Sequence, residues 1–125
     1  FIGLFQIIFF QFQPTDNGFR FSPVEIELAE VQKTLWPKYK DNKDFKLLVI
    51  GRAHTDAELK KYNERKKFSF PLYPDPKREV FSLFADQTIP RAYLFGKDGK
   101  LIHASIGYTK SEFQELMADI EAALK

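Results

Sequence analysis

The side chains that could carry out chemistry are few in this chain and lie far apart in the sequence. Its two histidines are His54, just ahead of a helix start, and His103, on a predicted strand. Two such scattered histidines support no Ser-His-Asp arrangement. Because His54 precedes the helix and does not share a face with Glu58, the pattern favours a surface or loop-capping histidine over a metal pair. The sequence therefore predicts no metal site.

Cysteine is absent from the 125 residues, which excludes disulfides, thiolate metal sites and cysteine nucleophiles in the chain as given. No glycine-rich phosphate loop follows a strand. Arg52 and Arg91 could bind an anion near strand ends, although surface ion pairs are the ordinary role of such arginines. We therefore predict no catalytic residue and no cofactor.

Pro90 stands directly ahead of the strand-like residues 91–95. Because proline cannot donate to a sheet ladder, it must begin this strand at a bend or an unpaired edge. Asp98-Gly99 is the signal of a tight hairpin turn, and residues 100–106 return as the partner strand. Pro90 therefore opens a β-hairpin.

Length and composition predict a single globular domain over residues 1–125. Domains most often have about 100 to 150 residues. Apolar residues make up 44% and charged residues 29% of the chain, and a net charge of +2 is too small to imply a nucleic-acid partner. The basic run at residues 59–67 is interleaved with Glu58 and Glu64 at helical spacing, which is typical of a solvated helix face. Residues 1–10 are apolar but too few for a membrane span, which takes about 20 residues.

The first half of the chain alternates strand and helix patterns. Residues 5–12 form a β-type run, and a helix follows with Ser22 at the N-cap, Pro23 at its first position and Glu25 in its first turn. We expect Pro37 to end this helix. Its buried stripe consists of Leu28, Val31 and Leu35.

The continuous apolar run at residues 45–51 predicts a strand covered on both faces in a parallel sheet. A capping box from Thr55 to Glu58 opens a second helix that ends at about Lys67. Residues 70–73 are extended, and residues 77–85 are expected to form a short helix.

A second capping box, from Thr109 to Glu112, opens the last helix, whose apolar face consists of Phe113, Leu116, Met117, Ile120 and Leu124. The element order is β-α-β-α, an extended piece with a helix, then β-β-α. Alternating strands and helices require parallel pairing with a right-handed crossover, and the hairpin adds an antiparallel pair. The fold class is therefore α/β with a mixed central sheet.

The segment "IPRAYLFGKDGKLI", followed by Gly107-Tyr108, resembles the C-terminal half of the TlpA and AhpC/TSA-like thiol-disulfide oxidoreductases. "VIGRAHTDAEL" and "FPLYPDPKREVFSLFADQTIPR" also resemble the bacterial TlpA-type versions, which carry an insertion before the hairpin. The resemblance covers about residues 22–125. It implies a thioredoxin-like three-layer α/β/α sandwich, with a βαβ unit, an inserted helix and a ββα unit, and a periplasmic or extracytoplasmic location.

The resemblance also implies a role for Ile89 and Pro90. In that family the proline before the hairpin is cis, and its loop lies against a Cys-x-x-Cys pair at the start of the first helix, where it accepts a substrate chain. A thiolate is stabilised there by the helix dipole and the free backbone amides.

The cysteine pair of that family is missing here. Phe21 and Val24 stand at the two cysteine positions if "ELAE" at residues 27–30 is matched to the family's Glu-Leu-Pro-Glu. A second register places Phe19 and Ser22 there. Neither register supplies a thiol.

Two hypotheses follow. In the first, the chain is a redox-inactive module that binds a protein or peptide partner in a groove between Phe21, Ser22, Pro23 and Val24 on one side and Ile89-Pro90 on the other. In the second, it is a thiol-disulfide oxidoreductase in a cysteine-free form. Only the second expects a Phe21→Cys, Val24→Cys variant to reduce disulfides without other changes.

Overall fold

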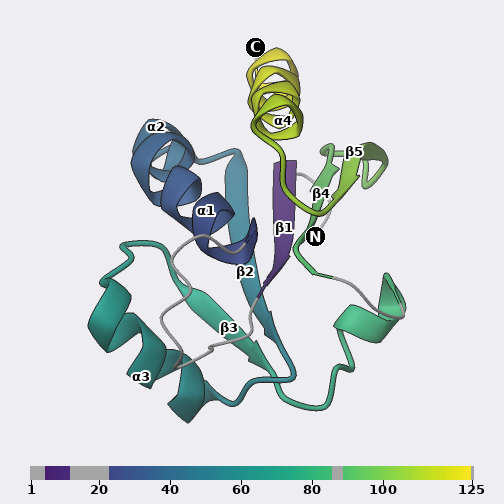
Figure 1. Ribbon diagram of the computed structural model, residues 1–125. Helices are drawn as coiled ribbons and strands as arrows, with labels where there is room; N and C mark the ends of the chain where they lie inside the picture. The colour runs from purple at the N-terminus through teal and green to yellow at the C-terminus, as the bar shows by residue number, and fades with distance from the viewer. Residues whose placement is uncertain (1–4, 12–22, 86–88, 125) are drawn as a thin grey trace.

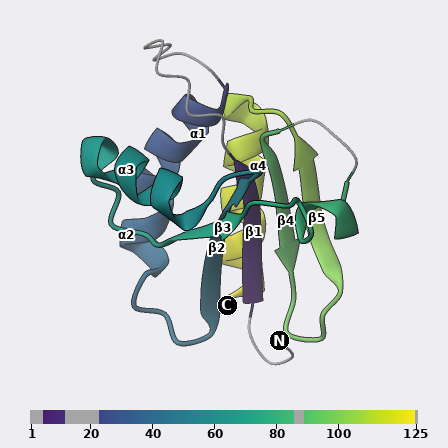
Figure 2. The same cartoon turned by 90° about the horizontal axis from the view of Figure 1, so that it is seen from below.

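The computed structural model describes residues 5–11, 23–85 and 89–124. These residues contain one five-stranded sheet with the strand order β3-β2-β1-β4-β5, and Figure 2 shows β2, β1, β4 and β5 side by side. The strands are β1 (Phe5–Gln11), β2 (Phe45–Arg52), β3 (Leu72–Asp75), β4 (Arg91–Phe95) and β5 (Leu101–Ile106). β2 is parallel to both β1 and β3, whereas β4 is antiparallel to β1 and β5. The predicted mixed sheet is confirmed.

The first helix does not end at the predicted proline. α1 (Pro23–Glu30) continues through a π-helical turn, η1 (Val31–Leu35), into α2 (Trp36–Tyr39), which contains Pro37. A proline inside a regular helix clashes with the carbonyl four residues earlier and removes one hydrogen bond. In the wider turn the Trp36 N–H bonds the Val31 carbonyl, five residues back, so the α-helical ladder is already interrupted when the chain reaches Pro37. The helical path therefore extends to Tyr39.

The other two helices begin where their capping signals predict. α3 (Asp56–Lys66) has a complete capping box between Thr55 and Glu58 and ends at Lys67, which has a left-handed backbone. α4 (Lys110–Ala123) begins at Thr109, whose hydroxyl accepts a hydrogen bond from the Glu112 N–H over 3.0 Å. These local side-chain bonds satisfy N–H groups that a helix start leaves unpaired.

The two faces of the sheet carry different layers. Along β2 and β4, successive side chains point to opposite faces of the sheet. On one face, Leu47, Val49, Ala92 and Leu94 pack in one cluster with buried residues of α1, α3 and α4. The opposite residues, including Leu48, Ile50 and Tyr93, pack in a second cluster around Phe81. The outer layers are therefore unequal in the described residues, with the long helices on one face and the short turn η2 (Phe81–Leu83) on the other. Figure 1 shows this separation.

The helix expected over residues 77–85 is reduced to η2, a single 3₁₀ turn. Arg78 has a φ of 59°, a left-handed conformation that cannot continue a right-handed helix. The carboxylate of Asp75 instead accepts hydrogen bonds from the N–H groups of Val80 and Phe81, at 3.1 and 2.9 Å. These bonds close the loop after β3 and hold Phe81 against the sheet.

Gly51, near the end of β2, marks the close approach of α3 to the sheet. A Cβ atom at this position would lie 2.7 Å from Cδ2 of Leu59 on α3. The close packing that Gly51 permits helps fix α3 on the same face as α1.

Candidate functional site

One edge of the sheet brings together the carboxyl ends of the parallel strands and the start of β4. Gln11 of β1 pairs with Gly51 of β2, and Arg52 of β2 pairs with Asp75 of β3. Because β4 runs the opposite way, its first residue, Arg91, pairs with Phe10 near the end of β1. Ligands of α/β proteins bind beside the carboxyl ends of parallel strands. This edge is therefore the place to look for a site.

Pro90 is held at this edge by the hairpin that it opens. Its peptide bond with Ile89 is cis, in agreement with the resemblance. Pro90 is buried, and its carbonyl oxygen accepts a hydrogen bond from the Gly107 N–H over 2.7 Å. Ile89 is half-buried and packs against the second cluster, around Phe81.

The other side of the predicted groove is described only in part. Val24 is half-buried and packs against the main core. Phe21 and Ser22 lie outside the described residues, and of Pro23 only the backbone, the first residue of α1, is described. The groove between these four residues and Ile89-Pro90 stays a prediction.

Tyr108 and two carboxyl groups of α1 lie close together beside this edge. Burial of the Tyr108 hydroxyl, together with the nearby charges of Glu30 and Glu27, raises its pKa above the ordinary value. Tyr108 is therefore protonated at neutral pH and can donate a hydrogen bond. The side chain of Glu27 is buried, with an exposed fraction of 3%. The sequence offered a signal for this burial, because Glu27 stands four residues before Val31, on the apolar stripe of the helix.

The start of α1 is fixed to α3 through Glu25. The Tyr62 hydroxyl donates a hydrogen bond to Glu25 over 3.0 Å, and the Lys66 ammonium pairs with the same carboxylate at 2.8 Å. Burial of Tyr62 and its proximity to Glu25 raise the pKa of the phenol. The contacts of Glu25 with Tyr62 and Lys66 therefore hold the first turn of α1 against α3, and none of these residues lies within residues 12–22.

Both histidines have structural partners. His54 is buried, so it is not a surface histidine, and its Nδ1 donates a hydrogen bond to the Arg52 carbonyl oxygen over 2.7 Å, which agrees with the loop-capping alternative. His103 is not isolated on its strand, because its Nδ1 lies 2.8 Å from the Asp119 carboxylate of α4. In the part of the chain that the structure describes, no group of three or more histidines, cysteines or carboxylates could hold a metal ion.

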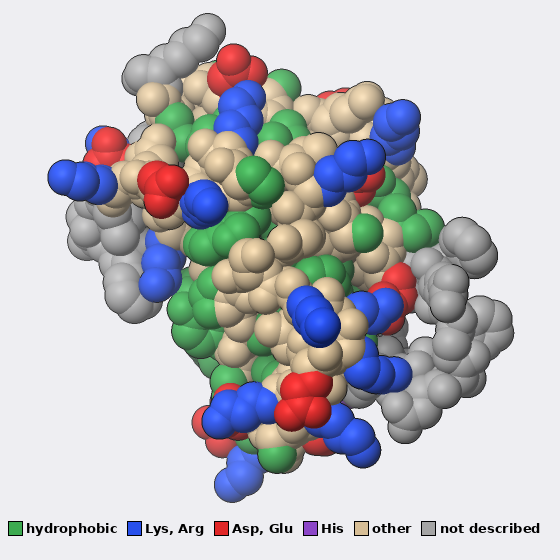
Figure 3. Space-filling view, turned by 90° about the vertical axis from the view of Figure 1, so that its left-hand side faces the viewer, with side chains coloured by type: hydrophobic (Ala, Val, Ile, Leu, Met, Phe, Trp, Pro, Cys, Tyr) green, Lys and Arg blue, Asp and Glu red, His purple; other side chains and the backbone are tan. Residues whose placement is uncertain are grey.

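The basic residues of α3 have acidic neighbours. Figure 3 shows cationic and anionic side chains interleaved on the face that contains α2 and α3. One such pair joins Lys60 to Asp56 at 2.9 Å, with both side chains largely exposed. The solvated helix face that the sequence predicts agrees with this pattern.

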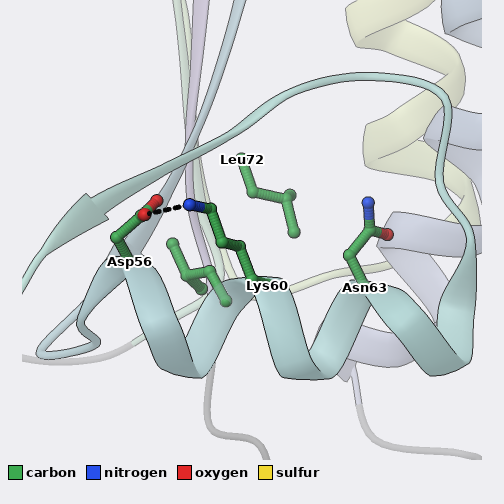
Figure 4. A pocket seen from close by; sticks show the side chains of 5 residues that line it. Asp56, Lys60, Asn63 and Leu72 are labelled. Atoms are coloured by element: carbon green, nitrogen blue, oxygen red, sulfur yellow. Dashed lines mark ion pairs between the residues drawn. The ribbon is translucent and has the colours of Figure 1, made fainter.

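A shallow pocket between α3 and β3 is a weak alternative site. Its lining consists of Asp56, Leu59, Lys60, Asn63 and Leu72, of which all but Leu59 are labelled in Figure 4. Asp56 and Lys60 pair with each other. The Asn63 amide both accepts from the Phe68 N–H and donates to the Phe68 carbonyl. The polar side chains that line the pocket are thus already paired within the chain, so few hydrogen-bonding groups are left there for a ligand.

Comparison with known proteins gives relatives of one kind. No family model matches the chain. The thiol-disulfide oxidoreductase ResA of Bacillus thuringiensis subsp. konkukian is 28% identical over 99 residues, which are 78% of this chain and 56% of that protein. The chain thus spans about half the length of the curated relatives that it matches.

Solved structures agree with this comparison. A candidate protein disulfide isomerase from Bacteroides thetaiotaomicron is 26% identical and has a TM-score of 0.87, over 98% of this chain and 75% of that one. A candidate thiol:disulfide interchange protein DsbE from Chlorobium tepidum is 20% identical with a TM-score of 0.80, over 98% of this chain and 82% of that one.

The sheet order, the hairpin behind Pro90 and these comparisons define the fold class. The chain has the thioredoxin-like fold of the thiol-disulfide oxidoreductases of the ResA, TlpA and DsbE type. The chain contains no cysteine. Among the residues that the structure describes, no helix is long and apolar enough to cross a membrane.

Proposed function

We propose that the chain is one thioredoxin-like domain over residues 1–125 that binds an extended protein or peptide segment beside Pro90 and does no redox chemistry. The observation that carries the proposal is that Ile89 and Pro90 are held in place by contacts that involve no thiol. The hydrogen bond from Gly107 to Pro90 and the packing of Ile89 come from the hairpin and the second cluster, not from the missing cysteine positions. An extended segment can use main-chain hydrogen bonds and apolar contacts there.

The absence of cysteine separates binding from catalysis. A thiolate must attack a disulfide for exchange to occur, and Phe21 and Val24 have no group that could do so. A domain of this fold can therefore keep the partner-binding loop while the exchange step is absent. The resemblance also supports an extracytoplasmic location for the chain.

The binding proposal can be tested with a thiol-free unfolded polypeptide. The probe is α-lactalbumin that has been reduced and S-carbamidomethylated. It is titrated into the chain, and isothermal titration calorimetry measures its affinity. An Ile89→Ser variant should bind about tenfold more weakly, because it loses most of one buried aliphatic side chain at the contact. Ile102→Ser is the matched control, since Ile102 is 44% exposed near the hairpin turn, at the other end of the sheet. Equal binding by both variants would contradict the proposal.

The alternative is an oxidoreductase in a cysteine-free form. A disulfide-reduction assay on the Phe21→Cys, Val24→Cys variant distinguishes the two, because a binding module should stay inactive whereas the alternative predicts restored reduction. The unchanged chain should be inactive under both hypotheses and serves as the blank.

A further inference from the structure

The guanidinium groups of two arginines lie close to one buried aromatic ring, at the same end of the sheet as Pro90. The guanidinium carbons of Arg52 and Arg78 lie 5.1 and 5.2 Å from the ring centroid of Phe81. The two charges are therefore within about 10 Å of each other. Phe81 is fully buried and held by the Asp75 carboxylate. The ring is thus a rigid support for both cations.

Like charges held this close oppose each other. Partial burial and the charge of Arg78 lower the pKa of Arg52. The Nε of Arg52 is buried and has no hydrogen-bond partner within the described part of the chain. The nearest acidic group along β3, Asp75, is engaged by the Val80 and Phe81 N–H groups. An anion near Arg52 would relieve the repulsion and satisfy this donor.

The position of these arginines relates them to the loop at Pro90. Arg52 is the last residue of β2, and β1 alone separates β2 from β4, which Pro90 precedes. With neighbouring strands about 4.8 Å apart, the two positions lie on the order of 10 Å apart across the sheet. An extended chain covers that distance with about three residues. One bound segment can therefore contact both.

We propose that Arg52 and Arg78 form an oxyanion-binding site that takes the carboxylate of an acidic side chain in the polypeptide bound beside Pro90. The planar guanidinium matches a carboxylate in shape and charge. The inference rests on the proposed function for the source of the carboxylate. A free phosphate offers the same chemistry and is the other source to be tested.

The test uses the whole chain and three probes: acetyl-Ala-Glu-Ala-Glu-Ala-amide, its glutamine counterpart, and inorganic phosphate. NMR follows the Arg52 Nε–Hε resonance, and affinity is measured on the same samples. The glutamate peptide should move this resonance and bind about tenfold more tightly than the glutamine peptide, as expected for one charge-assisted hydrogen bond. Binding of the glutamine peptide tests the Pro90 proposal separately.

Arg52→Gln should remove the preference for glutamate, whereas Lys46→Gln should keep it. Lys46 is exposed at the other end of β2, so this control loses the same charge away from the site. Arg52→Lys keeps the charge without the Nε donor and should retain only part of the preference, which covers the case that Arg52→Gln misfolds.

Equal affinities of the two peptides, or equal losses in Arg52→Gln and Lys46→Gln, would overturn the site. A response of Arg52 to phosphate alone would overturn the acidic polypeptide as its ligand. If neither peptide binds but phosphate moves the resonance, the proposed function fails while the oxyanion chemistry of the arginines stands.

Discussion

The backbone N–H of Gly107 donates a hydrogen bond to the carbonyl oxygen of Pro90 over 2.7 Å. It extends the β4–β5 pairing, in which Ile106 lies opposite Arg91, by one step beyond the strands. The backbone at Pro90 is thus secured by its own hairpin. This relationship explains how the loop can keep its geometry in a chain without cysteine.

Gly107→Ala should weaken both the fold and partner binding. Gly107 has a φ of 79°, and a Cβ there would meet no atom within 4 Å, so the cost is conformational, about 1 to 2 kcal/mol for an L-residue in the left-handed region. Gly99→Ala is the matched control, because Gly99 has a φ of 82° and equally open space in the hairpin turn. Urea denaturation should show similar losses in both variants. Only Gly107→Ala should reduce binding of the thiol-free polypeptide, and equal binding losses would argue against a role of this contact.

Tyr62→Phe should destabilise the chain by about 1.5 to 3 kcal/mol, because a buried hydroxyl loses a hydrogen bond to a charged carboxylate. Tyr39→Phe is the matched control, since the Tyr39 hydroxyl is buried without a hydrogen-bond partner in the described part of the chain. Its removal should be neutral or stabilising. Urea unfolding followed by the fluorescence of the single tryptophan, Trp36, measures both. Equal losses would show that Glu25 does not anchor α1 through Tyr62.

Asp75→Ala should destabilise the loop that holds Phe81. Two backbone N–H groups, of Val80 and Phe81, lose their acceptor, and we expect a loss of about 2 to 4 kcal/mol. Asp75→Asn keeps one acceptor oxygen and should lose less. Amide hydrogen exchange should speed up first at residues 80 and 81. Unchanged exchange at these two amides would contradict the account of the loop.

Glu58 should contribute stability that depends on pH. Hydrogen bonds from the Thr55 backbone and side chain lower the pKa of Glu58 in the folded chain. A carboxyl whose pKa is lowered on folding stabilises the fold above its ordinary pKa, and this contribution is lost as the pH falls through the folded value. The difference in stability between the natural chain and Glu58→Gln should therefore be larger at pH 6 than at pH 2.5. A difference that does not change between these two pH values would contradict the assignment.

Local signals predicted most of the fold correctly. The capping residues Thr55 and Thr109 and the Asp98-Gly99 turn act within a few residues, so the sequence pattern alone predicts their effect. The apolar run of β2 likewise predicted a strand with parallel neighbours, although one of its faces is only partly covered, since Leu48 is half-buried and Lys46 is exposed. The start of β4 behind Pro90 followed from the missing N–H of proline.

Two helix predictions were wrong, the end of the first helix at Pro37 and the helix over residues 77–85. In both places the structure depends on unusual backbone geometry or on contacts between residues several positions apart. Nothing in the residue types shows that a π turn lets the helix pass Pro37. The N–H groups of Val80 and Phe81 donate hydrogen bonds to Asp75 over five and six residues, and with the left-handed Arg78 these bonds replace the expected helix.

The resemblance pointed to Pro90, whereas the sequence favoured surface ion pairs for Arg52 and Arg91 over an anion site. The proximity of Arg52 to Arg78 at the Phe81 ring depends on the loop after β3 and could not be predicted from the sequence. The burial of Glu27 was overlooked although its spacing on the stripe of α1 indicated it.

The most direct test of the central claim is an NMR map of the chain, as it stands without cysteine, during titration with the reduced, S-carbamidomethylated α-lactalbumin. We predict that the largest amide shift changes fall on Val24, Ile89, Arg91, Gly107 and Tyr108, and that saturation occurs without any change in thiol or disulfide content. Shift changes spread evenly over the surface, or confined to the hairpin turn at residues 96–99, would contradict a binding site beside Pro90.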